Sequence, residues 1–567
     1  MRNFLKYITM VFIAGVSFSS CETTELDLRI SPNDLAADQA DPNLLLNSIQ
    51  LAYASNMAEI SDLGAELTRI DYMFGRDYFN NYPGDTFDDI WARTYSSDFN
   101  DAGNGDIRVG MFPNIAKLEE ADEISILDYS FHKGVAKTLQ AHMLMLLVDY
   151  LGEAALGEAG KPDDFPAPKL DDGGSIYAAA MTILDEAEEL LAGSPETLGA
   201  TDLFYGGDTT KWLKLINTIR LKSYMMTGDV GSFKAVIATD NFISSAADDF
   251  QFQYGTSELQ PDTRHPDYAD DYTPSGANIY QSNWLMELML NNNDPRIRYY
   301  FYRQVGATPG ADDDPNEETL ACSLATPPQH YIDGGFTYCS VPNGYWGRSH
   351  GNDEGTPPDN FERTAVGVYP AAGKFDDDDF AVDPEDDAFD GKVGLGKGGG
   401  GAGIEPIILS SYVEFWRAIM ADNDTERGLR LNRALQMSID KVMSFGSLDP
   451  SADLSFAPDQ TTVESYINDV VTNFNNATGD NKENIFAEQY FVTLYGGATE
   501  AYNYYRMTGY PTTVLPNWEA NPGPFPRSFL YPQNEVVTNP SLTQKQTMTQ
   551  QVFWDTNPAS PTFPPAN

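Results

Sequence analysis

The chain has 567 residues, with 84 Asp and Glu against 35 Lys and Arg, and a formal net charge of −49. Nucleic acids are bound through basic surfaces, so this charge balance excludes a nucleic-acid-binding protein. The length suffices for one very large domain or several. No clear linker divides residues 21–567, and we expect them to form a single domain.

The first twenty residues have the pattern of an export signal. Arg2 and Lys6 precede an apolar stretch from Tyr7 to Phe18, and two serines follow. The stretch is shorter than the roughly 20 residues that span a bilayer core. The alternative is a buried N-terminal strand, which the abrupt polar sequence after Cys21 disfavours. We predict a signal peptide over residues 1–20.

The residues around Cys21 resemble a bacterial lipobox. Two serines precede the cysteine, although Phe18 stands where such sites usually have Leu. Several acyl chains on one cysteine would anchor the protein firmly, because each buried methylene contributes roughly 0.8 kcal/mol. The acids Glu22, Glu25 and Asp27 resemble an outer-surface sorting signal. We therefore expect lipidation at Cys21 and a position on the outer membrane, facing the cell exterior.

Helical periodicity dominates both ends of the mature chain. Apolar residues recur at spacings of three and four, as expected for amphipathic helices. The first group covers residues 130–152, 175–192 and 210–226, with Ser175 and Thr210 at the starts of the second and third. The second group covers residues 407–421, 426–443, 462–476, 482–496 and 499–507.

Residues 250–405 differ, because they are rich in Gly, Pro, Asn, Asp and aromatic residues. Only 283–290 and 295–303 have helical patterns there. The acidic runs Asp376–Asp379 and Glu385–Asp387, and the Gly-rich stretch 394–403, indicate an exposed mobile loop. Long irregular segments in a helical protein are often functional. We expect this region to hold the ligand site.

Two cysteines remain after Cys21. Cys322 and Cys339 lie 17 positions apart in the loop-rich region, and disulfides persist outside the cytosol. We predict a bridge between them, which would contribute about 3 kcal/mol in the chain-entropy model. Two free buried thiols are the alternative.

The sequence matches known enzyme motifs only in part. Residues Gly347–Gly351 fit G-x-S-x-G, but acids, glycine and prolines follow Ser349 instead of a helix. Gly391–Lys397 lacks the Ser or Thr of a phosphate loop. The five histidines lack zinc-site spacing, so we expect no metal site and no cofactor, with a loop-bound calcium ion left open. A secreted serine hydrolase, a glycosidase or a structural surface protein remain the alternatives to a binding protein.

Two clusters of aromatic and polar residues indicate a sugar-binding site. Sugar rings stack on aromatic faces, while polar side chains form hydrogen bonds with the sugar hydroxyls. Trp346 is flanked by Gly347 in a polar loop, and we expect it to be exposed as a stacking platform. Core packing is the alternative for each aromatic residue. The first cluster is Tyr72, Phe74, Arg76, Tyr78, Phe79 and Tyr82; the second is Tyr331, Phe336, Tyr338, Tyr345, Trp346, Arg348 and His350. We predict ligand contacts from Tyr345, Trp346, Arg348, His350, Tyr331, Tyr78, Phe79 and Tyr82.

A set of motifs in chain order resembles the SusD/RagB family. The stretches that carry the resemblance are Ala141–Glu153, Phe165–Pro168, Ile176–Tyr177, Asp185–Leu191, Lys211–Tyr224, Asn293–Arg296, Tyr412–Ala418, Tyr504–Pro511, Pro526–Arg527, Tyr531–Pro532 and Glu535. Together they span most of the chain.

The resemblance implies an all-α fold, in which paired helices of tetratricopeptide-like type form a scaffold for a large loop-rich ligand-binding region. It also implies a non-enzymatic role: capture of oligosaccharides or peptides and their delivery to a SusC-like TonB-dependent transporter. The family's motifs are mostly structural and do not assign the ligand site.

Overall fold

A computed structural model describes residues 40–97, 99–100, 107–306, 326–338, 340–353, 363–380 and 393–565. Cys21, the leader, Cys322 and Cys339 lie outside the described residues, so the lipid anchor and the disulfide stay predictions. Within the described part, no helix is long and apolar enough to cross a membrane.

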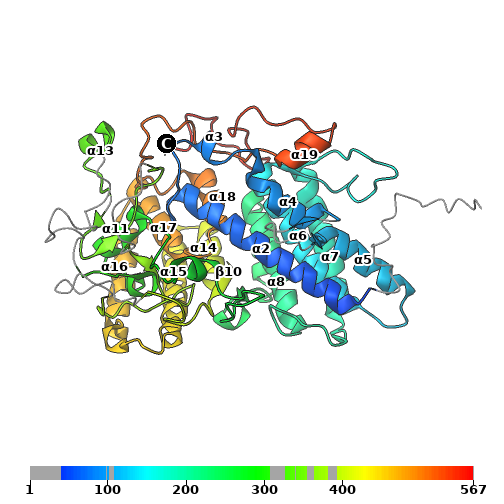
Figure 1. Cartoon of the computed structure of the whole chain (residues 1–567), viewed down its shortest axis with the longest axis horizontal. Helices are drawn as coiled ribbons and strands as arrows, with labels where there is room; N and C mark the ends of the chain where they lie inside the picture. Colours follow the sequence, from blue (N-terminus) through cyan, green and yellow to red (C-terminus); the bar gives the residue numbers. More distant parts are fainter. Residues whose placement is uncertain are drawn as a thin grey trace, which may run out of the picture.

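The N-terminal half is a bundle of paired helices (Figure 1). α6 packs against α7, α7 against α8 and α8 against α9, while α2 and α5 cover α6. The bundle consists of α2 (Pro42–Thr68), α4 (Asp88–Tyr95), α5 (Met111–Ile124), α6 (Ser130–Leu151), α7 (Gly173–Ala192), α8 (Thr209–Thr227) and α9 (Val230–Ile237). The three helices predicted here are confirmed as α6, α7 and α8.

The starts of α7 and α8 differ from the sequence prediction by one or two residues. Asp172 caps α7 by accepting from the backbone NH of Ser175, at 3.0 Å. Asp208 caps α8 by accepting from the NH of Thr210, at 2.9 Å. A carboxylate two or three positions before these NH groups satisfies them as well as a hydroxyl would.

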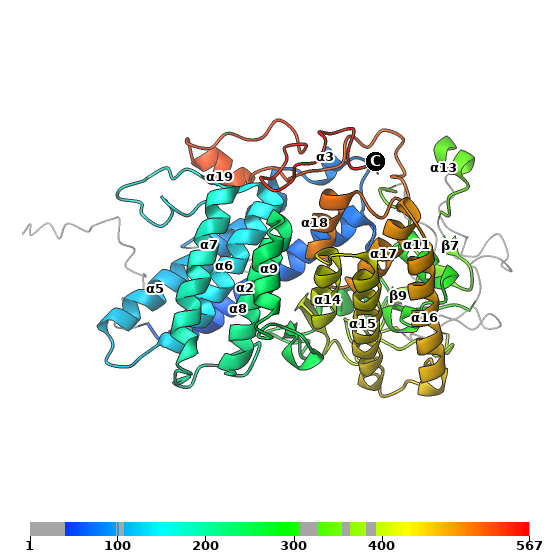
Figure 2. The ribbon, with the colours of Figure 1, turned by 180° about the vertical axis from the view of Figure 1, so that it is seen from behind.

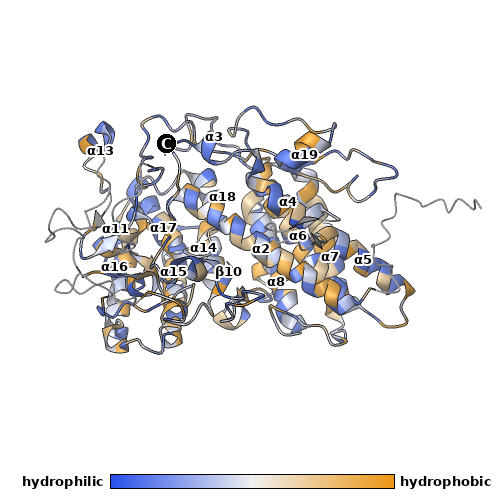
Figure 3. Ribbon diagram, in the orientation of Figure 1, coloured by the Kyte–Doolittle hydropathy of each residue, from blue (hydrophilic) through white to orange (hydrophobic). Residues whose placement is uncertain are grey.

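The C-terminal half repeats the paired arrangement, and Figure 2 shows both sets of helices side by side. Its helices are α14 (Ser410–Ile419), α15 (Asp424–Met443), α16 (Gln460–Asn476), α17 (Asp480–Thr493) and α18 (Thr499–Thr508), which confirm the five predicted there. α18 packs on α2 and so joins the two halves. The helix ribbons carry both hydrophobic and hydrophilic residues, as amphipathic packing requires (Figure 3).

Short elements complete the chain. Antiparallel β5 (Phe250–Gln253) and β10 (Ile404–Ile408) pair between the halves. The other two-stranded pairs are β1 (Phe99–Asn100) with β2 (Ile107–Arg108), β3 (Glu153–Ala154) with β4 (Asp171–Asp172), β6 (Phe301–Tyr302) with β9 (Ala365–Val366), and β7 (Ser340–Val341) with β8 (Tyr345–Trp346). Short helices are α3 (Tyr78–Asn81), α10 (Pro266–Asp271), α11 (Asn283–Asn291), α12 (Ile297–Tyr300), α13 (Gln329–Gly334) and α19 (Gln533–Thr538), with 3₁₀ turns at Gly84–Phe87, Ala246–Asp248, Ser444–Leu448 and Leu454–Phe456.

A buried ion pair fastens the loop-rich region to the C-terminal helices. Arg296 binds Asp294 at 2.6 Å. Its guanidinium also donates to Ser438 in α15 and to Thr493 in α17, both at 3.0 Å. Because buried charges need partners, this turn holds three segments in one arrangement.

The expectation of an exposed loop is wrong for Asp376, Asp377 and Gly403, which are buried, but Asp378, Asp379 and residues 395–397 are exposed, and Glu385–Asp387 lies outside the described residues. Asp376 is fully buried and pairs with Arg303 at 2.6 Å. The Gly-rich stretch packs closely, since a Cβ at Gly403 would collide with the carbonyl of Pro370. Asp376 and Gly403 therefore contribute to packing, because Arg303 lies against the first and the backbone of Pro370 against the second.

Candidate functional site

The hairpin of β7 and β8 buries most of the second aromatic cluster. Trp346 is only 1% exposed, and its backbone NH donates to Thr364 Oγ1 at 2.7 Å. The expectation that this tryptophan is exposed is therefore wrong. A Cβ at Gly347 would collide with the carbonyl of Gln281, so the glycine allows the strand to lie against its neighbour instead of presenting a mobile loop.

Of the other residues in that cluster, Tyr331, Tyr345, Arg348 and His350 are also buried, whereas Phe336 and Tyr338 are exposed. The Tyr345 ring lies beneath Arg303, with 5.0 Å from the guanidinium carbon to the ring centre. The Tyr331 hydroxyl donates to the carbonyl of Pro516 at 2.7 Å. Burial and the positive charge of Arg69 lower the pKa of His350 well below its ordinary value, so the imidazole is neutral.

The first cluster is split between interior and surface. The Tyr78 hydroxyl accepts from Arg69 at 3.1 Å, and the Tyr82 hydroxyl donates to Glu66 at 2.9 Å; both rings are buried. Phe79 and Phe74 are exposed.

One cavity of about 520 Å³ unites residues from both clusters. It is lined by Tyr72, Phe74, Asn278, Tyr280, Arg348, Asp353 and Arg363. These side chains come from the loop after α2, the loop before α11, the segment after β8 and the segment before β9. Arg348 is the predicted ligand contact that lines it. We name this cavity the tyrosine pocket.

The tyrosine pocket has two rings at an angle and a third at its rim. Tyr72 and Tyr280 meet edge to face, with ring centres 5.8 Å apart and planes at 70°. Phe74 is 59% exposed. The guanidinium carbon of Arg363 lies 3.8 Å from the centre of the Tyr280 ring. Such stacking fixes the orientation of the ring and of the cation.

Polar groups surround these rings. Arg348 lies over Tyr72 and Tyr280, at 5.7 and 5.2 Å from their centres. Asp353 accepts from Arg76 at 2.7 Å. Burial raises the pKa of Tyr72 well above its ordinary value, so its hydroxyl stays protonated, and it donates to the carbonyl of Asn352. The pocket thus combines apolar faces with fixed donors and acceptors, the composition of a small-molecule site.

Sequence reasoning missed Asn278, Tyr280, Asp353 and Arg363. They lie up to 291 positions from Tyr72, so no local pattern joins them. The available signal was compositional: Tyr280 stands in a loop with Asn and Gly, like the residues of the predicted clusters.

The serine of the G-x-S-x-G pattern lies in no nucleophile elbow. Ser349 is buried, and a turn follows it in place of a helix. The elbow requires the nucleophile to project from a strand-to-helix turn. In the described part of the chain, no three His, Cys, Asp or Glu side chains are placed to hold a metal ion.

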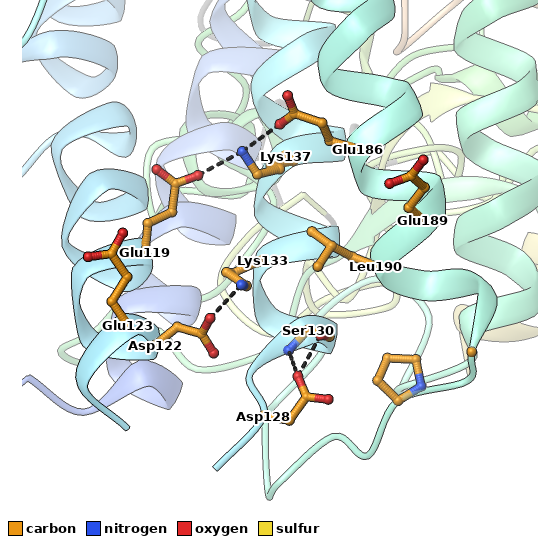
Figure 4. Close-up of a pocket in the computed structure, with 12 residues that line it drawn as sticks. Glu119, Asp122, Glu123, Asp128, Ser130, Lys133, Lys137, Glu186, Glu189 and Leu190 are labelled. Atoms are coloured by element: carbon orange, nitrogen blue, oxygen red, sulfur yellow. Dashed lines mark hydrogen bonds and ion pairs between the residues drawn. The ribbon is translucent and has the colours of Figure 1, made fainter. Parts of the chain in front are cut away.

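A second cavity, of about 760 Å³, lies among α5, α6 and α7 (Figure 4). Lys137 reaches Glu119 at 2.7 Å and Glu186 at 3.0 Å, and Lys133 reaches Asp122 at 2.5 Å. No aromatic side chain is among its lining residues. It therefore offers no stacking surface, and the tyrosine pocket is the better candidate for a ligand site.

Comparisons with known proteins agree with one another. Residues 32–325 match the model of a SusD-like family described as "Starch-binding associating with outer membrane". A SusD/RagB family protein from Bacteroides thetaiotaomicron superposes with a TM-score of 0.60 at 16% identity, covering 92% of this chain and 100% of that one. No curated protein matches.

Two further solved structures share the fold. A SusD homolog from Bacteroides fragilis has a TM-score of 0.57 at 16% identity, with 91% of this chain and 99% of that chain covered. A chitin-binding SusD homolog from Flavobacterium johnsoniae has a TM-score of 0.57 at 16% identity, with 91% and 100% covered. These likenesses confirm the predicted all-α scaffold of paired helices.

Proposed function

The chain belongs to the SusD-like family, and from this premise we propose that it captures oligosaccharides outside the cell and passes them to a SusC-like TonB-dependent transporter. Members of the family are binding proteins associated with the outer membrane, so the protein is not an enzyme. The handover to a transporter rests on family analogy.

The tyrosine pocket is the proposed site of capture. The observation that carries this assignment is the exposed ring of Phe74 beside the paired rings of Tyr72 and Tyr280. Sugar rings present apolar faces to such aromatics, and their hydroxyls bond to fixed polar groups. Arg348 and Asp353 supply a donor and an acceptor at the pocket wall. Chitin binding by a protein of the same fold supports a glycan over a peptide.

We propose that most of the other residues predicted to contact the ligand instead stabilise the segments around the tyrosine pocket. Tyr345, Trp346 and His350 lie within three positions of Arg348 in the chain, and their burial fixes the segment that carries it. Tyr78, Tyr82 and Tyr331 are likewise buried, and they stabilise neighbouring loops. Phe79, which is exposed, is the one of the eight that could extend the binding surface beyond the pocket.

We also propose the anchorage that the sequence predicts. Cleavage after residue 20 and acylation of Cys21 would leave residues 21–567 as one domain on the outer face of the outer membrane. Cys21 stands 19 positions before Ala40, the first described residue. At roughly 3.3 Å per residue, such a tether would reach some 60 Å from the lipid.

Calorimetric titration with a neutral oligosaccharide series tests the site. Phe74→Ala and Tyr280→Ala should each weaken binding by about fivefold or more, because a ring contact contributes roughly 1 kcal/mol. Phe165→Ala is the matched control, since Phe165 is exposed but does not line the pocket. Full affinity in both pocket variants would refute the assignment.

A further inference from the structure

A polar groove lies along α16, at the end of the molecule where α11 is also found (Figure 1, Figure 2). It is made of two cavities, of about 290 Å³ and about 450 Å³. Asn293 and Thr462 line both cavities, so the two spaces meet between the loop after α11 and the first turn of α16. We call the joined cavities the α16 groove.

One wall of the α16 groove is a row of polar side chains on α16. Four lining residues follow one another at spacings of three and four, which places them on one face of the helix. They are Thr462, Ser465, Asp469 and Asn473, and all are exposed. The start of the helix is fixed, because Asp459 accepts from the backbone NH of Thr462 at 2.8 Å.

The opposite wall is the loop after α11. Asn292 and Asn293 lie there, and both are exposed. Asn293 has a φ of 52°, a left-handed conformation that asparagine adopts more readily than most residues. Its backbone NH donates to the carbonyl of Leu290 at 3.1 Å, and the NH of Asp294 donates to that of Met289 at 2.9 Å. The end of α11 thus holds this loop in one shape.

Two aromatic rings lie between these walls. Phe456, in the 3₁₀ turn before α16, stays 41% exposed although the guanidinium carbon of Arg298 lies 5.5 Å from its ring centre. Tyr466 is buried, and its hydroxyl donates to Asp294 at 2.6 Å. The exposed part of the Phe456 ring is a surface on which a sugar ring can stack.

The polar side chains of both walls are available to a ligand. In the part of the chain that the structure describes, the side chains of Ser465, Asp469 and Asn473 make no hydrogen bond or ion pair, and neither do those of Asn292 and Asn293. Amides and hydroxyls both donate and accept hydrogen bonds, and a carboxylate accepts them. These groups match the hydroxyls of a sugar, which also donate and accept.

The two arginines of the α16 groove already have carboxylate partners. Arg303 binds Asp376 at 2.6 Å, and Arg298 binds Asp378 at 3.1 Å. An anionic ligand would have to compete with these pairs for the guanidinium groups. The groove therefore favours an uncharged ligand that is rich in hydroxyl groups.

α11 connects the α16 groove with the tyrosine pocket. Tyr280 lines the pocket just before this helix, and Met289 and Leu290 line the groove near its end. The helix has nine residues and is therefore about 13 Å long, a distance that a chain of several sugars covers. The hairpin of β7 and β8 makes a second connection, since Tyr345 lines the groove and Arg348, three positions later, lines the pocket.

We propose that the α16 groove is a second sugar-binding site, which holds one part of a neutral oligosaccharide while another part lies in the tyrosine pocket. This inference rests on the proposed function and narrows its ligand to chains that reach both sites. Once one part of such a chain is bound, the other part is held at a high effective concentration. Affinity should therefore rise steeply with chain length.

Titration calorimetry with maltooligosaccharides and N-acetylglucosamine oligomers, each of two and of six sugars, tests the inference. In a series that binds, the wild type should bind the hexamer roughly tenfold or more tighter than the dimer. Phe456→Ala should weaken hexamer binding about fivefold, because a ring contact contributes roughly 1 kcal/mol, and it should leave dimer binding unchanged. Ser465→Leu should do the same, because it fills the groove and removes a hydroxyl.

Leu454→Ala and Asn468→Leu are the matched controls. Both residues are exposed, Leu454 in the same 3₁₀ turn as Phe456 and Asn468 on α16, and neither lines the groove. Since all four positions are exposed, the melting temperature should stay at its wild-type value. Weaker hexamer binding in the two groove variants alone would therefore report a lost contact and not unfolding.

The other outcomes separate this inference from glycan capture. Wild-type hexamer affinity in both groove variants, together with weaker binding in Phe74→Ala, would overturn the second site and leave capture in the tyrosine pocket intact. Equal weakening of dimer and hexamer binding by the groove variants would also overturn it, because the groove would then be the first site. Binding of no oligomer by the wild type would overturn glycan capture itself.

Discussion

The ammonium nitrogen of Lys222 in α8 lies 2.7 Å from a carboxylate oxygen of Glu500 in α18, and both side chains are buried. Asp149 in α6 is the second partner, at 3.1 Å. Burial by itself would lower the pKa of Lys222, but the two carboxylates raise it above its ordinary value. One charged side chain of the N-terminal bundle thus depends on a helix of the C-terminal half.

Lys222→Met should lower the free energy of unfolding by about 3–5 kcal/mol, because it leaves two buried carboxylates without their cation. Urea denaturation followed by circular dichroism measures the change. Lys234→Met is the matched control, since the exposed Lys234–Asp422 pair should contribute less than about 1 kcal/mol. Equal effects of the two substitutions would contradict the central role of Lys222.

Trp346→Ala should act on stability. Its ring is buried beside the β7–β8 hairpin, so truncation should cost about 3–5 kcal/mol of unfolding free energy. The same denaturation experiment detects this loss. If the variant instead kept wild-type stability but bound oligosaccharides more weakly, Trp346 would contact the ligand, as the sequence predicted.

The carboxyl groups of Glu66 and Asp71 predict a pH dependence of stability. Folding raises the pKa of Asp71 from 3.8 to about 8 and that of Glu66 from 4.5 to about 7, mainly through burial. Between those values the folded protein binds more protons than the unfolded chain, so the unfolding free energy falls as the pH rises from about 4 to about 8.

Asp71→Asn should flatten this decline, because the amide does not ionise. Thermal unfolding of both proteins at pH 5, 6, 7 and 8 gives the comparison, and the gain from the substitution should be largest at pH 8. A constant difference across this range would mean that Asp71 ionises normally in the folded protein.

Cys21→Ala should release the protein from the membrane fraction, if Cys21 carries the acyl chains. Metabolic labelling with a fatty acid, followed by phase partition in detergent, measures the change. Cys322→Ala is the control, because it should keep both label and partition. A wild-type protein that takes up no label would contradict the anchor.

The helices could be predicted from the sequence because apolar residues recur at spacings of three and four, and this pattern is visible within one short stretch of chain. Leu139, Met143 and Leu146 lie on one helix and face one core. The tyrosine pocket could not be predicted in the same way. The Trp346 backbone NH bonds to Thr364 and Gly347 lies against Gln281, both far away in the chain, and the rings of Tyr72 and Tyr280 meet across 208 positions. The glycines that suggested an open loop instead permit close backbone contact.

The turn at Asp294 and Arg296 has a consequence for the order of folding. Its bonds to Ser438 and Thr493 join residues 142 and 197 positions apart. Contacts of such long range form late, since a large loop must close before they stabilise anything. By contrast, α6, α7 and α8 pack against helices that are their neighbours in sequence. We therefore expect α6, α7 and α8 to pair early in folding, and the turn at Arg296 to be fixed only after α15 and α17 have formed.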